Sequence, residues 1–214
     1  ASTLLLRNIN EETHAQIKFL SEASTSMVER VGLFTIIVLG EVVVGIVNGA
    51  SHLAMEWNLA LVVFLGTFIA VGVWFNYFDF ISHRKPKAGL SSYYSWLYLH
   101  LPLVIGIVGL GAGTVNLIEH IHDTVSIETK WLFFGSLSLV FISISLISAT
   151  IIQASEHAIM TKTAKVLMLL CAFLAVVAGF IEINSILTLT VAVVLLIIPT
   201  AAGVIIWIRE KPFF

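Results

Sequence analysis

The sequence predicts an all-α, polytopic integral membrane protein with about six transmembrane helices and both termini in the cytoplasm. Hydrophobic residues make up 58% of the 214 residues, and charged residues only 11%. Soluble domains carry about a quarter charged residues, so this chain has too few to coat a core in water. Its apolar residues fall in long runs, and its basic residues cluster at alternate connections between them. We therefore expect lipid to solvate most of the chain.

The apolar runs are long enough to cross a hydrocarbon core, which takes about 20 helical residues. Charged and turn-forming residues separate them, as expected where the backbone returns to water. In chain order we expect spans at 28–48, 57–81, 93–118, 131–153, 164–180 and 183–208. Together they form one six-helix transmembrane bundle over 28–210, preceded by a polar segment, 1–27, that we expect to be a tether or an interfacial helix. Trp57, Trp131 and Trp207 lie at span ends, where amphipathic rings prefer to sit.

The basic residues determine the orientation. With a cytoplasmic N-terminus, only Lys130 of the eleven basic residues lies outside. Because basic residues accumulate on the cytoplasmic side, this orientation is favoured over its inverse. The ten residues placed inside are Arg7, Lys18, Arg30, Arg84, Lys85, Lys87, Lys162, Lys165, Arg209 and Lys211.

Composition and motifs also exclude several function classes. The net charge is −2 and no long basic run occurs, so we expect no nucleic-acid partner. Cys171 is the only cysteine, so an internal disulfide is impossible. We find no phosphate-binding loop, nucleophile elbow or zinc-protease helix, and we expect no enzyme activity and no cofactor.

In the first span, Glu41 lies near the expected bilayer centre. A lone carboxylate there is costly unless it is protonated, paired or beside water. Arg30 lies eleven residues earlier, about three turns, so both residues share one helix face, which we expect to look into the bundle. The alternative is that Arg30 extends to lipid headgroups while a neutral Glu41 bonds a neighbouring helix.

Asn76 and Asp79 in the second span lie on one face, close to the cytoplasmic end and at the level of Arg30. We therefore expect an ion pair between Arg30 and Asp79, either functional or purely structural. The third span carries His100, then Pro102 and a glycine series that includes a GxxxG pair at Gly109 and Gly113. This helix suits a moving element or a proton site, or else His100 is a packed, hydrogen-bonded core residue.

The loop after the third span contains four residues of types that can bind a metal ion, Glu119, His120, His122 and Asp123. No further set of metal-ligating residues accompanies them in the sequence, so we expect no metal site. The serines of the fourth span, from Ser136 to Ser148, are expected to bond neighbouring helices.

Three motifs carry a family resemblance: ERVGLFTIIVLGE at 29–41, WFNYFD at 74–79 and YLHLPLVIGIV at 98–108. In this order they resemble the low temperature requirement protein A family of bacterial membrane proteins, which implies a location in the bacterial inner membrane. The chain resembles the second half of the usual family length, and Val42 stands where serine is usual. We therefore expect either a stand-alone half or part of a longer protein.

We expect Arg30, Glu41, Asn76, Asp79 and His100 to form a polar cluster inside the bundle. The leading hypothesis is a transporter or channel for a small solute or ion, proton-coupled through Glu41 and His100, and completed by a second copy or another membrane subunit. The alternative is an accessory or scaffold subunit of a larger membrane complex, and a membrane enzyme ranks third.

Overall fold

The computed structural model describes residues 24–82, 84–121, 124–152 and 158–210. The expected tether lies outside these residues except for its last few, which already belong to the first helix. The helices are α2 (Thr25–Ser51), α3 (Trp57–Phe80), α4 (Leu90–Glu119), α5 (Ile127–Thr150), α6 (Ala158–Ala178) and α7 (Ser185–Glu210). This arrangement confirms the predicted all-α bundle, with boundaries shifted by up to six residues.

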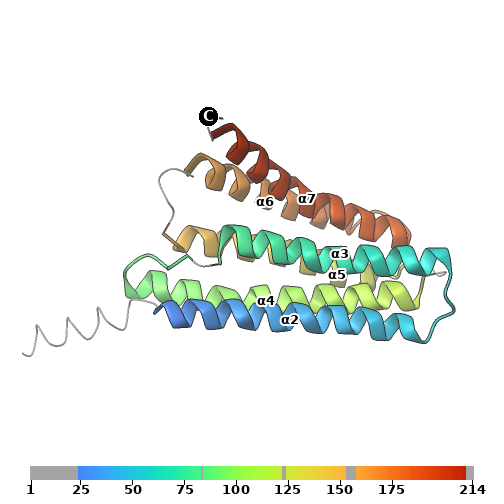
Figure 1. Cartoon of the computed structure of the whole chain (residues 1–214). Helices are drawn as coiled ribbons and strands as arrows, with labels where there is room; N and C mark the ends of the chain where they lie inside the picture. Colours follow the sequence, from blue (N-terminus) through green and yellow to red (C-terminus); the bar gives the residue numbers. More distant parts are fainter. Residues whose placement is uncertain (1–23, 83, 122–123, 153–157, 211–214) are drawn as a thin grey trace, which may run out of the picture.

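Five of these helices are long and apolar enough to cross a membrane, namely α2, α3, α4, α5 and α7. The remaining helix, α6, has 21 residues and carries Lys162 and Lys165 in its first half. In Figure 1, α2, α3, α4 and α5 run nearly parallel, and α6 and α7 lie together at an incline to them. The start of α2 and the end of α7 lie at the same end of the bundle (Figure 1).

Helix α4 packs against α5 through its glycines. A Cβ atom at Gly106 would lie 3.2 Å from the Ser136 carbonyl oxygen, and one at Gly113 would lie 3.0 Å from the Cβ of Phe133. A Cβ at Gly109 would collide with the Ser136 hydroxyl. The close helix approach expected from the GxxxG pair is therefore confirmed, with α5 as the partner.

The connection between α3 and α4 completes the end of α5. The Lys87 backbone N–H donates to the Thr150 carbonyl oxygen at 2.8 Å, and the Lys87 ammonium donates to that of Ala149 at 2.8 Å. The last carbonyl groups of a helix have no hydrogen-bond donor within it, and a cation there also interacts favourably with the negative end of the helix dipole. The α3–α4 connection, which the charge distribution predicts to be cytoplasmic, therefore caps α5.

Lys130, the predicted outside exception, is only 5% exposed, and its ammonium donates to the Ile181 carbonyl oxygen at 3.5 Å, just beyond α6. The Lys130 ammonium interacts with a carbonyl group at the end of α6 and is not part of a basic loop surface. This explains why Lys130 does not follow the distribution of the other ten basic residues between the two sides of the membrane.

The orientation can be tested by labelling single cysteines. In a Cys171→Ser background, Ala88→Cys should react with a membrane-impermeant maleimide only from the cytoplasmic side, because it lies in the basic α3–α4 connection. Thr124→Cys, at the other end of α4, should react only from outside. Opposite labelling would invert the orientation.

The α4–α5 contact predicts unequal costs for the same substitution at two glycines. Gly106→Ala should destabilise the chain in detergent by about 1–3 kcal/mol, because the added methyl group meets backbone that cannot move aside. Gly135→Ala is the matched control, because its Cβ would meet nothing within 4 Å among the described residues. Equal unfolding free energies for the two variants would show that the helices do not meet at Gly106.

Candidate functional site

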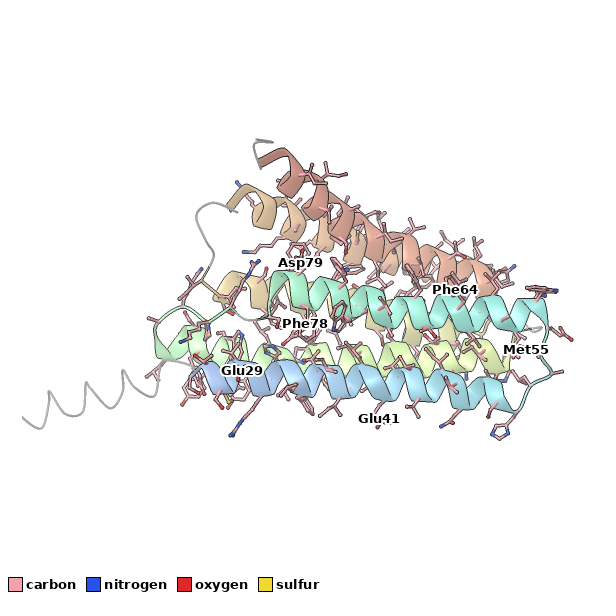
Figure 2. The ribbon with its side chains drawn as sticks, viewed as in Figure 1. Glu29, Glu41, Met55, Phe64, Phe78 and Asp79 are labelled. Atoms are coloured by element: carbon pink, nitrogen blue, oxygen red, sulfur yellow. The ribbon has the colours of Figure 1, made fainter. Side chains whose placement is uncertain are left out.

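The five predicted site residues do not gather into one interior cluster. Asn76 and His100 are buried, whereas Arg30, Glu41 and Asp79 are exposed. Arg30 and Glu41 do share a face of α2, but that face points away from the bundle, so the expectation that it looks inward is wrong. Figure 2 shows Glu41 on the outer side of α2.

Packing determines the orientation of α2. Its inner face is formed by apolar and small side chains, and a Cβ atom added at Gly45 or Gly49 would lie 3.6 or 3.1 Å from Val115 of α4. The residues buried there are Val28, Gly32, Thr35, Val38, Leu39 and Ile46. Because one side of α2 meets α3 and α4, the side with Arg30 and Glu41 is left outside.

The expected ion pair between Arg30 and Asp79 is also wrong within the described residues. The cation near Asp79 is Arg84, whose Nη2 donates to the Asp79 carbonyl oxygen at 3.1 Å. The Asp79 carboxylate lies toward α7, where its Oδ2 is 3.7 Å from the position that a Cβ atom at Gly203 would occupy. Arg30 and Asp79 share a level in the membrane, but they occupy different sides of the bundle.

A buried hydrogen-bonded pair joins α3 and α4. The Tyr77 hydroxyl lies 3.2 Å from Nε2 of His100, and Nδ1 of His100 lies 2.7 Å from the Trp96 carbonyl oxygen. A carbonyl only accepts, so the proton sits on Nδ1, and Nε2 accepts from Tyr77. Thr35 of α2 interacts with the same Tyr77 hydroxyl. Three helices therefore meet at this pair.

Aromatic rings enclose the imidazole of His100. The centroid of the Trp96 ring lies 5.0 Å from that of His100 and the Tyr77 centroid 5.9 Å, both edge-on. The Trp96 indole N–H is buried without a partner among the described residues. The sequence pattern pointed to His100 but not to Tyr77, Trp96 or Thr35, although Trp96 precedes His100 by one helical turn.

Asn76 links α3 to α7. Its side-chain nitrogen donates to the Gly72 carbonyl oxygen at 2.8 Å and to that of Leu196 at 3.1 Å. Pro199 follows Leu196 in α7 and removes one backbone N–H from that helix. The carbonyl that Pro199 leaves without its helical donor is that of Leu195, so the bond from Asn76 to Leu196 lies one residue beyond that position and adds a contact between α3 and α7. The Asn76 Oδ1 has no partner within the described part of the chain.

A polar pocket lies at the end of the bundle where α4 ends and α5 and α7 begin. Its volume is about 200 Å³, and its polar lining includes Asn116, His120, Thr129 and Ser185. The Thr129 hydroxyl donates to Oδ1 of Asn116 at 2.7 Å, whereas the buried Ser185 hydroxyl has no partner among the described residues. The positive-inside distribution predicts that this pocket, called the outer pocket below, lies on the outer side of the membrane.

Of the loop residues considered as metal ligands, His120 lines this pocket, while His122 and Asp123 lie outside the described residues. The described residues contain no group of three or more histidine, cysteine, aspartate or glutamate side chains that could hold a metal ion.

Comparison with known proteins identifies a family. The family model described as bacterial low temperature requirement A protein matches residues 10–200, a range that includes all five predicted site residues. No curated protein and no solved structure matches the chain.

The buried pair makes a testable contribution to stability. Tyr77→Phe should cost about 1–3 kcal/mol in unfolding free energy, because it leaves the buried Nε2 of His100 without its donor. Tyr98→Phe is the same chemical change at a side chain that is 61% exposed, and it should cost little. Detergent unfolding of the two variants measures the difference. Equal stability would show that the Tyr77 hydroxyl does not bond His100.

Proposed function

The chain belongs to the bacterial low temperature requirement A family, and we propose that it is an inner-membrane transporter or channel for a small solute or ion, linked to protons through His100. The observation that supports the proposal is the buried Tyr77–His100 pair. Ionisable groups are expensive inside a membrane, and those that persist commonly serve the passage of ions or protons. Imidazole also changes charge near neutral pH.

The pair and the outer pocket occupy opposite halves of α4. His100 and Asn116 are sixteen residues apart, about 24 Å along the helix. Between them α4 presents buried apolar side chains, Leu103, Ile107 and Leu110, each at most 2% exposed. We interpret this as a closed arrangement, in which a solute held at the outer pocket is separated from the cytoplasmic half by an apolar layer.

Opening such a layer requires helix movement, and α4 and α7 carry features that permit it. Pro102 lies inside α4, and Pro199 lies inside α7 beside the Asn76 contact. Prolines interrupt the backbone ladder and are common where membrane helices bend. The proposed movement would repack α7 against α3.

A second candidate function is that of an accessory or scaffold subunit. It is favoured by the outward position of Arg30 and Glu41, because charged side chains on a lipid-facing surface indicate contact with another protein. In this case Tyr77 and His100 only hold helices together.

Flux through reconstituted vesicles distinguishes the two candidates. Vesicles that contain the wild-type chain should show an internal pH change when they carry an outward-directed concentration gradient of a transported solute. Amino acids, sugars and monovalent ions are tested one after another. His100→Gln keeps hydrogen-bonding capacity but cannot titrate, so it should remain folded while the proton flux falls to the level of protein-free vesicles. Tyr98→Phe is the control and should behave as wild type.

If His100→Gln has the same proton flux as wild type, His100 does not carry protons. A wild-type chain that moves none of the offered solutes, and a His100→Gln variant that still supports growth of a deletion strain in the cold, would favour the scaffold.

A further inference from the structure

The outer face of α2 carries a regular stripe of exposed residues. Leu33, Ile37, Val44 and Val47 are 59%, 64%, 52% and 55% exposed, and Gly40 lies between them. Their spacing alternates between four and three residues, which is the seam spacing of helices that pair along their length. Any exposed helix face repeats at this spacing, and a second helix laid along this one would contact these five residues.

Gly40 has a different environment from the other glycines of α2. A Cβ atom at Gly40 would meet nothing within 4 Å among the described residues, whereas Gly45 and Gly49 pack against Val115 of α4. Glycine is the least favourable helix residue after proline. Packing within this bundle gives no reason for glycine at position 40, while a closely approaching external helix does.

Glu41 follows Gly40 and is exposed on the same side of α2 (Figure 2). It is the seventeenth residue of a 27-residue helix, about 24 Å from Thr25, which places it near the middle of the bilayer. Hydrocarbon offers no hydrogen-bond donor or acceptor, so a carboxyl group at this depth requires a protein partner.

We propose that the outer face of α2 is the interface with a second copy of this chain, paired in the same orientation about a two-fold axis along the membrane normal. The axis passes close to Gly40, where the two backbones approach, and it brings the two Glu41 carboxyl groups to the same depth. Glu41 lies about 100° around the helix from Gly40, so it flanks this seam, where the second copy covers its carboxyl group from lipid.

Charge at the cytoplasmic end of α2 points to the same occupant. Glu29 and Arg30 are adjacent and both are exposed. A two-fold axis beside them brings Glu29 of one copy toward Arg30 of the other, and it does so twice. Asn48, also exposed, flanks the seam near the opposite end of the helix. An unrelated partner would need a separate matching group at the depth of Glu29 and Arg30, at that of Glu41 and at that of Asn48. A second copy presents its own polar groups at these three depths by symmetry.

Disulfide formation in membranes tests the interface. In a Cys171→Ser background of the full chain, Ile37→Cys should form a covalent dimer under mild oxidation. Ile105→Cys, on α4, is the matched control because isoleucine is 64% exposed at both positions, and it should stay monomeric. Dimer from both positions alike, or from neither, would overturn the proposal, and so would capture of a different membrane protein at Ile37→Cys.

Two further variants test Gly40 and Glu41 through subunit counting by single-molecule photobleaching in dilute liposomes. Wild type and Glu41→Gln should bleach in two steps, because an amide keeps the hydrogen-bonding capacity of the carboxyl group. Gly40→Leu and Glu41→Leu should each raise the dissociation constant by about tenfold or more, without unfolding the bundle that they do not contact. Single-step bleaching of wild type, or dimers unaffected by both leucine variants, would contradict the interface. Neither outcome depends on whether the chain transports a solute.

Discussion

Hydrocarbon supplies no hydrogen-bond partner, and this constraint accounts for where the polar groups of the chain lie. The backbone satisfies it through the long helices α2 to α7. Buried side chains satisfy it by bonding one another or nearby carbonyl oxygens, as Tyr77, His100 and Asn76 do. Four buried side-chain atoms have no partner among the described residues, namely Asn76 Oδ1, Trp96 Nε1, Ser143 Oγ and Ser185 Oγ. Glu41 differs from these because a single chain leaves it exposed on the outer side of α2. Its position is the basis of the proposed pairing with a second copy.

Close packing in the middle of the bundle depends on α4. Its glycines admit α5 on one side, and Gly111, whose Cβ would lie 2.7 Å from Val42, admits α2 on another. The same helix carries His100 toward the cytoplasmic half and Asn116 at the outer pocket. Helix α4 therefore connects the two polar regions that a transport function would use, while the apolar residues between them keep the bundle closed.

The sequence predicted the helices well because span length and charge distribution follow directly from bilayer thickness and the cost of polar backbone. It also predicted that Arg30 and Glu41 share a face, since this follows from helical geometry alone. It could not predict which way that face points. Every face of α2 is largely apolar, so packing against α3 and α4, through glycines and small side chains, decides the outcome. For the same reason the sequence predicted that Arg30 lies beside Asp79, because the two residues have similar depths. In the structure the two side chains point in different directions from α2 and α3. The arginine that contacts Asp79 is Arg84.

The division of polar residues between a hydrogen-bonded interior and an outer face of α2 that meets a second copy is tested most directly by electron cryo-microscopy of the chain in lipid nanodiscs. The expected map shows two copies with their α2 helices closest at Gly40, Glu41 covered by protein, and His100 bonded to both Tyr77 and the Trp96 carbonyl oxygen. A single copy with Glu41 in contact with lipid, or a map in which His100 has left Tyr77 and faces Glu41, would contradict it.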